Sequence, residues 1–318
     1  MHLVEPSRCR EASEVEYDRS MPDRFDSVFR PGLFAGQVHV VTGGGTGIGR
    51  CIAHELACLG AHVVVTGRRP EPLEETVDEI EAAGGEASFK LMNIRDEEQV
   101  AAVVGEIVAE RGRLDGLVNN AGGQFPSPAE KIPAKGWRAV VDTNLNGTFI
   151  VSQAVFNHWM GEHGGAIVSI AADMWVGYPG MAHTGAARAG VVNLTRTLGL
   201  EWVRHGVRVN AVAPGVILSS GMLNYPPEVI ARAAKGSRGF PPSRLGTESE
   251  VSAAVAFLLS PAAAFITADT LRVDGGASLY KTHFTPMGNH DRLPSWDGFH
   301  LSPRVPEELL GASEPEKE

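Results

Sequence analysis

Short apolar runs alternate along the middle of the chain with longer segments of helical periodicity. Seven of these runs have the length of strands. The clearest helical segment is 96–111, where apolar residues recur at spacings of three and four and form one stripe. We therefore predict a helix over 96–111 and strands over 37–42, 61–66, 87–92, 114–119, 166–171, 207–212 and 269–274.

Strands that alternate with helices are typical of βα units, in which helices cover both faces of a parallel sheet. We therefore expect an α/β fold: a single doubly wound, Rossmann-type domain with a seven-stranded parallel sheet flanked by helices, over residues 31–280. Residues 1–30 carry twelve charges of mixed sign and few apolar side chains, which predicts a flexible N-terminal arm. Residues 281–318 are predicted to form a C-terminal tail, whose first part is a candidate for docking on the domain.

The charge balance narrows the possible partners. The 318 residues include 28 Lys and Arg against 38 Asp and Glu, a formal net charge of −10, which argues against electrostatic binding of nucleic acid or an anionic membrane. No apolar run approaches the ~18 residues of a membrane-spanning helix, and the N-terminal segment lacks the apolar core of a secretory signal. The cysteines show no metal-ligand spacing, so we expect no metal site. These features predict a cytoplasmic protein without nucleic-acid or membrane partners.

A glycine-rich turn follows the first predicted strand and precedes a predicted helix. Glycines at such a turn allow close backbone approach, and the helix N-terminus presents free amides and the positive end of a dipole to a pyrophosphate. The alternative is an ordinary tight turn, but the strand–turn–helix context favours a nucleotide site. The residues expected to bind the dinucleotide here are Gly43, Thr46, Gly47, Ile48 and Gly49.

The second predicted strand ends in Gly67-Arg68-Arg69. An acidic residue at this place would accept a hydrogen bond from a ribose 2′-hydroxyl, whereas guanidinium groups suit a 2′-phosphate. We therefore predict that Arg68 and Arg69 select NADPH over NADH, the alternative being a solvated pair at a helix start.

With this turn, three further segments resemble the short-chain dehydrogenase/reductase family over about 36–276: Asn-Asn-Ala-Gly at 119–122, the segment 142–149, and Pro-Gly-Val-Ile at 214–217. The resemblance implies that two residues after the third strand flank an adenine, that residues after the fourth line the cofactor channel, and that residues after the sixth hold the carboxamide. The implied contacts are Asn93, Ile94, Asn120, Ala121, Gly122, Ala171, Arg188, Pro214, Gly215 and Ile217.

The catalytic positions depart from this family. Ala172 stands where the resemblance expects a Ser, and Thr184-Gly-Ala-Ala-Arg188 stands where it expects Tyr-x-x-x-Lys. In the usual chemistry the Lys lowers the Tyr pKa, and the Tyr donates a proton to a carbonyl oxygen. A Thr hydroxyl is a far weaker acid, and an Arg keeps its charge without titrating usefully. The departure argues against ordinary ketone reduction.

One subgroup of the family fits the departure. The segments 119–137, 159–170, 183–195, 257–267 and 273–280 resemble peroxisomal trans-2-enoyl-CoA reductase, which reduces a carbon–carbon double bond with NADPH. Hydride delivery to Cβ of an enoyl thioester leaves an enolate, which needs hydrogen bonds but no protonation at oxygen. We therefore expect NADPH-dependent reduction of a trans-2-enoyl-CoA. The resemblance further implies a homotetramer, while the final Glu-Pro-Glu-Lys-Glu carries no peroxisomal address and favours the cytoplasm.

Four residues are candidates for the catalytic work: Asn144, Tyr178, Thr184 and Arg188. Asn144 would hold a water, Tyr178 and Thr184 would donate hydrogen bonds to the enolate, and Arg188 would contact the cofactor. Alternatives stay open: Thr184 is also a candidate helix cap, and Tyr178 a packed loop aromatic.

Four more are candidates for substrate contact: Gln124, Phe125, Asp173 and His183. Core packing for Phe125, solvation for Asp173 and a structural hydrogen bond for His183 are the alternatives. The segment 218–246 occupies the place of a mobile substrate lid, where Arg232, Lys235, Arg238 and Arg244 either meet coenzyme A phosphates or form a solvated face.

Two other functions compete with enoyl reduction. One is a carbonyl reductase or alcohol dehydrogenase in which Tyr178 replaces the missing acid. The other is a non-catalytic nucleotide-binding member of the family. Fold alone does not decide among the three, because one fold hosts many functions.

Overall fold

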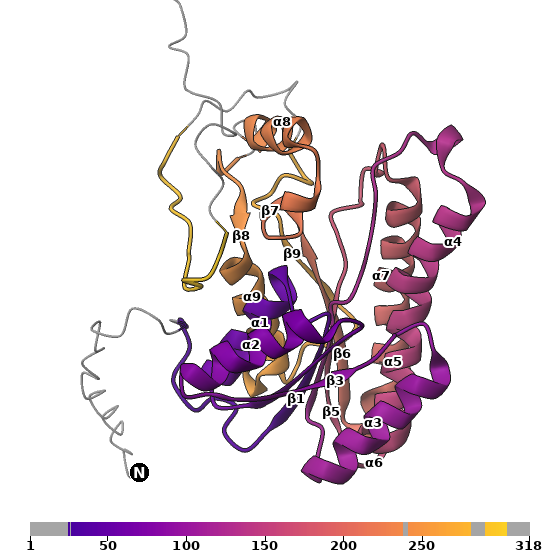
Figure 1. Ribbon diagram of the computed structural model, residues 1–318, viewed down its shortest axis with the longest axis vertical. Coiled ribbons are helices and arrows are strands. Elements are labelled where there is room, and N and C mark those ends of the chain that lie inside the picture. The colour runs from indigo at the N-terminus through magenta and orange to yellow at the C-terminus, as the bar shows by residue number, and fades with distance from the viewer. Residues whose placement is uncertain (1–24, 26, 238–240, 281–289, 304–318) are drawn as a thin grey trace, which may run out of the picture.

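A computed structural model describes residues 25, 27–237, 241–280 and 290–303 (Figure 1). Seven parallel strands form one sheet in the order β3-β2-β1-β4-β5-β6-β9. This confirms the predicted single α/β domain. The strands of this sheet are β1 (Val38–Thr42), β2 (His62–Gly67), β3 (Glu86–Leu91), β4 (Gly116–Asn119), β5 (Gly165–Ile170), β6 (Val207–Pro214) and β9 (Thr270–Val273).

Helices cover both faces of the sheet (Figure 1). One face packs against the first, second and last helices, and the other against the central helices. Apolar strand residues point into both layers because a parallel sheet is buried on both sides. The α-helices are α1 (Gly47–Cys58), α2 (Pro70–Ala82), α3 (Glu97–Arg111), α4 (Ala134–Val141), α5 (Gly147–Val155), α6 (Gly161–His163), α7 (Ala182–Trp202), α8 (Pro227–Ser237) and α9 (Glu248–Leu259).

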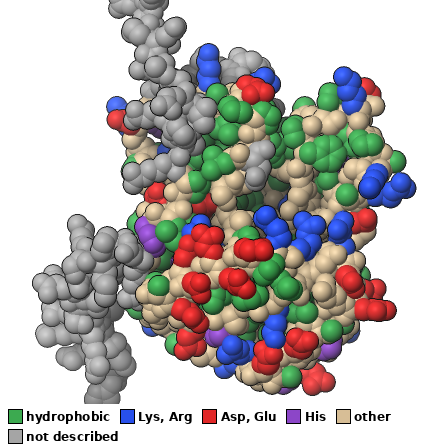
Figure 2. All heavy atoms as spheres, in the orientation of Figure 1, with side chains coloured by type: hydrophobic (Ala, Val, Ile, Leu, Met, Phe, Trp, Pro, Cys, Tyr) green, Lys and Arg blue, Asp and Glu red, His purple; other side chains and the backbone are tan. Residues whose placement is uncertain are grey.

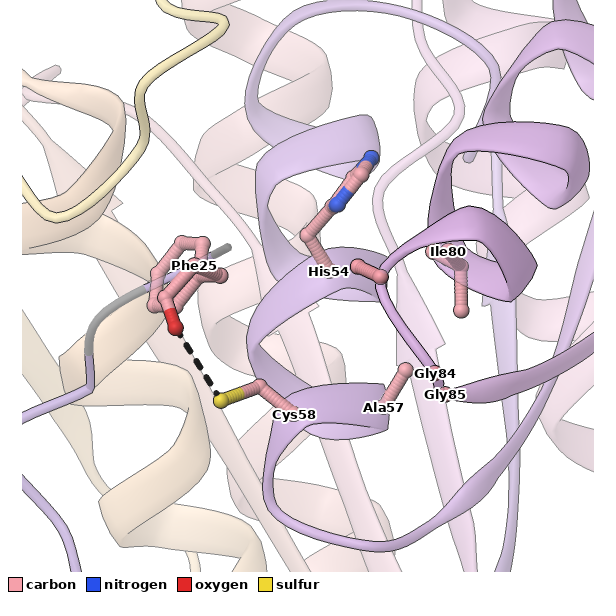
Figure 3. A pocket seen from close by; sticks show the side chains of 8 residues that line it. Phe25, His54, Ala57, Cys58, Ile80, Gly84 and Gly85 are labelled. Atoms are coloured by element: carbon pink, nitrogen blue, oxygen red, sulfur yellow. Dashed lines mark hydrogen bonds between the residues drawn. The ribbon is translucent and has the colours of Figure 1, made fainter. Parts of the chain in front are cut away.

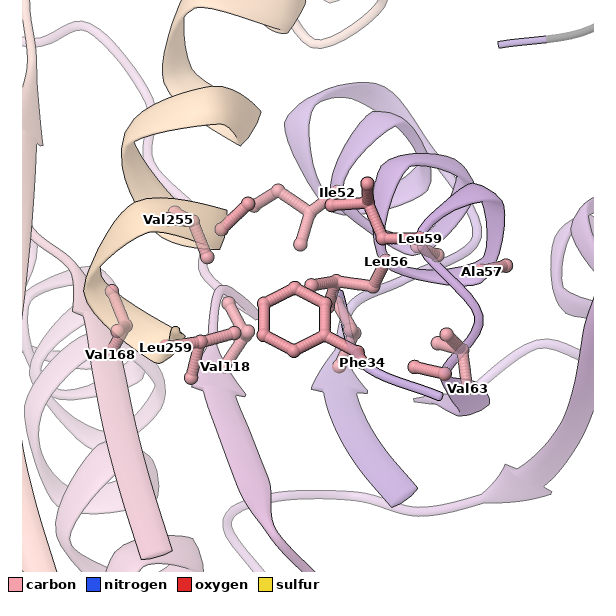
Figure 4. Close-up of a cluster of buried hydrophobic side chains, with 14 of the residues drawn as sticks. Phe34, Ile52, Leu56, Ala57, Leu59, Val63, Val118, Val168, Val255 and Leu259 are labelled. Atoms are coloured by element: carbon pink, nitrogen blue, oxygen red, sulfur yellow. The ribbon is translucent and has the colours of Figure 1, made fainter. Parts of the chain in front are cut away.

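The core between the sheet and the layer of α1 and α9 centres on Phe34, which is fully buried (Figure 4). Ile52 and Leu56 reach it from α1, and Val255 and Leu259 reach it from α9. This layer fixes α1, and with it the turn before α1, against the sheet.

The chain from α4 to α6 continues through two π-helical segments, η2 (Asp142–Asn146) and η3 (Phe156–Met160). Single π turns inside α-helices occur often at functional sites. Here η2 carries Asn144, one of the predicted site residues, and buries it completely. The sequence pattern did not predict either π segment.

The predicted lid lies between two short parallel strands that were not predicted, β7 (Ile217–Leu218) and β8 (Gly246–Thr247). Between them run the 3-10 turn η5 (Met222–Asn224) and α8. The two strands close the base of the lid, which stands above the carboxyl ends of the main sheet (Figure 1). The other 3-10 turns are η1 (Ala129–Lys131), η4 (Val203–His205) and η6 (Pro261–Ala263).

The described parts of the two terminal segments pack on the domain. Phe25 and Ser27, from the expected arm, are buried, and Phe25 lies beside Cys58 of α1 (Figure 3). Residues 290–303, which we call the C-terminal strap, run along the start of α9 and insert Phe299 against α1. The remaining residues of the expected arm and tail lie outside the described ranges.

Candidate active site

A cavity of about 590 Å³ lies at the carboxyl ends of β1 to β4. The chain reverses direction across the sheet here, since β2 and β3 lie to one side of β1 and β4 lies to the other. Ligands of doubly wound proteins bind at such switch points. Basic side chains gather at a hollow of the surface between the lid and the central helices (Figure 2).

The glycine-rich turn forms one wall of this cavity through Gly43, Gly45 and Thr46. Gly43 adopts φ +66°, and a Cβ on Gly49 would approach both the Gly43 carbonyl and the Asn120 amide to within 3.0 Å. Only glycine therefore fits at these two places. Gly47 and Ile48 begin α1, just outside the cavity wall.

Hydrogen bonds tie this turn to the end of β4. The Thr42 hydroxyl accepts from the backbone N–H groups of Asn120 and Ala121, each at 3.0 Å. The Asn120 side chain donates to the carbonyls of Thr42 and Gly43 at 3.0 and 3.1 Å. Asn120, Ala121 and Gly122 line the cavity, so the two predicted motifs meet in one wall.

The opposite end of the cavity is basic. Arg68 and Arg69, which follow the end of β2, are exposed and line it. Asn93 and Ile94 lie beside them, and Arg95 adds a third guanidinium that the sequence analysis missed. Arg95 could have been found from the sequence, because it is a cation shortly after the third predicted strand and therefore lies at the same edge of the sheet as Arg68.

Arg188 and Asn144 lie side by side against Gly122, at the wall formed by the end of β4. Arg188 is 8 % exposed and donates to the carbonyl of Ile170 at 2.6 Å. The Asn144 amide closes two hydrogen bonds of 2.9 Å with the backbone of Gly123. A Cβ on Gly122 would collide with both side chains. Burial lowers the pKa of Arg188 to about 10, so the guanidinium stays charged at neutral pH.

Tyr178 stands near Arg188, in the loop after β5. It packs on Gly185 of α7, and its charge state is coupled to Arg188 and to Tyr225 of the lid. Burial is the main cause that raises the pKa of Tyr178 above its usual value. Tyr225 accepts a hydrogen bond of 2.7 Å from Gln124, which links the lid to the loop after β4. Tyr225 was not among the residues chosen from the sequence.

Thr184 does not cap α7, because that helix begins two residues earlier, at Ala182, after Met181. Thr184 is fully buried, and its hydroxyl lies 3.1 Å from Nδ1 of His183. That nitrogen also accepts the Thr184 N–H at 2.7 Å, so it carries no proton and the hydroxyl donates to it. The geometry corrects the expectation that Thr184 donates to substrate.

His183 is fully buried, and burial lowers its pKa, which keeps the ring neutral. Its ring stands edge-on to Phe125, with centroids 4.5 Å apart. Both predicted substrate residues therefore pack on each other, and Phe125 stays half-buried beside the exposed Gln124.

The ends of β5 and β6 come together beside this cluster. The Asp173 N–H donates to the Pro214 carbonyl at 3.1 Å, and Gly215 lies tightly against Asp274. Burial, followed by the nearby Asp274 charge, raises the pKa of Asp173. Ala171 and Ile217 are buried at the same strand ends, outside the lining of the cavity.

The four lid cations do not act alike. Arg232 and Lys235 are exposed on α8, whereas Arg238 lies outside the described residues. Arg244 forms an ion pair with Glu250 at 2.6 Å and also donates to the carbonyls of Leu293 and Pro294. Arg244 therefore anchors the strap, and only the α8 pair faces solvent among the described lid cations.

Two observations concern other classes of site. Within the described ranges, no three metal-ligating side chains of His, Cys, Asp or Glu gather in one group. The helices of those same ranges are all too short or too polar to cross a bilayer.

Comparisons with known proteins match most of the domain. The model of the enoyl-(acyl carrier protein) reductase family matches residues 43–278. The chain is 43% identical over 240 residues to a probable 2,4-dienoyl-CoA reductase of Bacillus subtilis, covering 74% of this chain and 94% of that protein.

Two solved structures are similar in fold and sequence. The citronellol catabolism dehydrogenase AtuB of Pseudomonas aeruginosa PAO1 is 53% identical, with a TM-score of 0.73 over 80% of this chain and 100% of that chain. A putative NAD(P)-dependent gluconate 5-dehydrogenase of Beutenbergia cavernae, with bound NADP, is 37% identical, with a TM-score of 0.73 over 79% of this chain and 100% of that chain.

Proposed function

Because the chain belongs to the short-chain dehydrogenase/reductase family and is an oxidoreductase of that family, we propose that it reduces the carbon–carbon double bond of a trans-2-enoyl-CoA with NADPH. This proposal rests on one observation: neither hydroxyl group near Arg188, that of Thr184 or that of Tyr178, is suited to transfer a proton to a substrate. Thr184 is buried against His183, and Tyr178 has a raised pKa.

Carbonyl reduction requires an acid that transfers a proton to the carbonyl oxygen, and such an acid works best with a pKa near the operating pH. A phenol whose pKa is raised donates a hydrogen bond but holds its proton. At the thioester oxygen, enoyl reduction needs only that hydrogen bond, because the enolate that forms there is stabilised and takes up its proton at Cα from water. Tyr178 therefore suits double-bond reduction, and the charge of Arg188 adds electrostatic stabilisation nearby.

Several features of the cavity and its surroundings support a dinucleotide phosphate as the ligand. Gly43 and Gly49 leave room that a Cβ would fill, and the turn opens onto the N-terminus of α1. Arg68, Arg69 and Arg95 supply guanidiniums where a 2′-phosphate would lie. Arg188 and the Gly122 loop would hold the nicotinamide half, and Pro214, Gly215 and Ile217 its carboxamide. When bound, NADPH supplies the hydride.

The acyl-CoA would enter between the loop after β4 and the lid. The hydrogen bond between Gln124 and Tyr225 joins this loop to the lid, Phe125 follows Gln124 in the loop, and Arg232 and Lys235 are exposed on α8 of the lid. The dienoyl-CoA reductase named among the relatives supports a coenzyme A thioester as substrate.

A second candidate is an alcohol dehydrogenase that acts on an isoprenoid alcohol or carbonyl. It is favoured by the 53% identity to the citronellol catabolism dehydrogenase. In this alternative Tyr178 must act as the proton donor in place of the family tyrosine.

The experiment that separates the two follows NADPH absorbance with purified protein and four substrates: crotonyl-CoA, a medium-chain trans-2-enoyl-CoA, acetoacetyl-CoA and citronellal. We expect oxidation of NADPH with the two enoyl thioesters only. Turnover of citronellal or acetoacetyl-CoA alone would support the second candidate instead. Repeating the measurement with NADH, on the substrates that react, compares the rates with the two cofactors. The variants Arg68→Ala and Arg69→Ala should lower the preference for NADPH over NADH.

We also propose a cytoplasmic homotetramer. Trp137, Phe149, Leu200 and Val203 are exposed on the helices that would pair between subunits, and exposed apolar clusters mark protein interfaces. Light scattering after size exclusion tests the assembly, and a monomer at working concentration would refute it.

A further inference from the structure

Glu248 is a buried acid between the strap and the phosphate turn. It is the first residue of α9 and is 1 % exposed. Ser302 of the strap donates to its Oε2 at 3.3 Å, and the backbone N–H of Ser220, at the base of the lid, also stabilises its ionised form. Glu248 thus touches the strap and the lid at once.

The same carboxyl faces the start of α1. A Cβ built on Gly47 would lie 3.8 Å from Oε1 of Glu248 and 3.3 Å from the hydroxyl of Ser220. Oε1 has no hydrogen-bond partner among the described residues. An oxygen this buried and unpartnered, beside the free amides of α1, lies where it would feel a bound phosphate.

Charged and titratable groups face Glu248 from each element packed on it. Arg50 of α1 favours the ionised carboxylate but is engaged in an ion pair with Glu79. Asp297 of the strap opposes ionisation, and the buried Cys51 of α1 also lies within electrostatic reach of the carboxyl. Burial is the largest cause, and it raises the pKa of Glu248 to about 7. The carboxyl therefore changes charge near neutral pH.

We propose that Glu248 makes the affinity for the dinucleotide pH-dependent: the neutral acid accommodates the pyrophosphate at the start of α1, and the carboxylate repels it. The inference rests on the proposed function only in taking this turn as the pyrophosphate site. The strap that buries Glu248 lies beyond residues 43–278, the part that the family model matches.

The test is a direct titration of the full-length protein with NADPH, followed by fluorescence at about pH 6 and about pH 8.5. The wild type is compared with Glu248→Gln, which keeps the shape and removes the charge. We expect equal affinities at the lower pH and about fivefold tighter binding by the variant at the higher pH. The 2′-phosphate also titrates near pH 6, but it changes both proteins alike.

Glu55→Gln is the matched control. Glu55 is a second buried acid between α1 and α9, two turns along α1 from Gly47; its pKa is also raised to about 7, and it is bonded to Ser27 and to Ser252 of α9. Its substitution should leave the affinity at both pH values as in the wild type. Ser302→Ala removes a donor to the carboxylate, so it should move the pH transition upward. This variant tests the inference even where Glu248→Gln folds poorly.

Each outcome has one meaning. If Glu248→Gln and the wild type bind NADPH equally at both pH values, and Ser302→Ala moves nothing, the inference is overturned and the proposed function stands. If no protein binds NADPH at either pH, the proposed cofactor is wrong and the inference fails with it.

Discussion

At the scale of single residues, the hydroxyl group at the position of the family tyrosine is turned away from the site. Thr184 lies at the position of the family tyrosine, yet its hydroxyl is turned to His183 and has no exposed surface. Tyr178 reaches the neighbourhood of Arg188 from a different loop. Under the proposed function, the hydrogen-bond donor is therefore on the loop after β5 and not on α7.

This arrangement predicts opposite results for two substitutions. Tyr178→Phe should lower kcat for crotonyl-CoA by about 10²-fold, since one donor to a developing oxyanion contributes on that order. Thr184→Val should change kcat by less than about threefold, because the hydroxyl that it removes is not available to substrate. Steady-state kinetics with both variants measures this, and NADPH affinity serves as the control for intact binding. A large loss in Thr184→Val with an active Tyr178→Phe would reverse the assignment.

The sequence identified those site residues that belong to short, contiguous motifs. Gly43, Arg68 and Asn120 lie in contiguous motifs at strand ends, and the structure brings them to one cavity. The pairing of Thr184 with His183 and the reach of Tyr225 to Gln124 depend on side-chain direction and on a loop 101 residues away. No pattern along the chain encodes those contacts.

At the scale of elements, the joint between the glycine-rich turn and α1 depends on the absence of a side chain at Gly49. The Gly43 carbonyl and the Asn120 amide occupy the place of a Cβ. These groups also tie the turn to β4, so they have little freedom to move aside.

Gly49→Ala should therefore weaken NADPH binding by more than about tenfold and destabilise the fold by about 1–3 kcal/mol, the usual cost of overpacking. Gly105→Ala in α3 is the matched control. Its new Cβ would meet only His158, at 3.5 Å, and alanine is the better helix former. Isothermal titration and urea denaturation measure the two effects. Wild-type binding by Gly49→Ala would show that the turn is not a phosphate site.

The seven main strands were predictable from their short apolar runs, and the helix at 97–111 from its regular apolar period. The strands β7 and β8 have two residues each, too few for a period to be detected. The π segments use the same residues as an α-helix, so only packing distinguishes them. The strap has no periodicity and is held by specific hydrogen bonds of Trp296 with Thr247 and Glu250 at the start of α9.

At the scale of the whole molecule, buried acids set the response of stability to pH. Burial raises the pKa of both Glu55 and Glu248 to about 7, above the ordinary value of 4.5. Such groups keep their protons in the folded state while the unfolded chain releases them. The stability that they contribute is present below pH 4.5 and is lost as the pH rises toward 7.

Glu79 acts in the opposite direction. Hydrogen bonds from His54 and Arg50 outweigh its partial burial and lower its pKa to about 2. Its contribution is present above pH 4.5 and is lost as the pH falls toward 2. Because Glu55 and Glu248 lower the stability as the pH rises and Glu79 lowers it as the pH falls, the protein is expected to be most stable in mildly acidic solution.

The free energy of unfolding should therefore fall between about pH 5 and about pH 8, by up to about 3 kcal/mol for each of the two buried acids. Urea denaturation at several pH values measures it. Glu55→Gln should flatten part of the decline, because glutamine has no proton to lose. A stability that rises over this range would contradict the prediction.

The π segment η2 makes the orientation of Asn144 depend on the number of residues in the continuous helical rod from α4 to α6. A π turn contains one residue more than the α turn that it replaces, and each residue of an α-helix turns the chain by about 100°. Deleting a single residue between Asp142 and Asn146 would let the rod relax to a plain α-helix and rotate Asn144 away from Gly123. A one-residue gap at this place in a relative would therefore change how the helix is joined to the loop after β4, although an alignment would score it as a minor length difference.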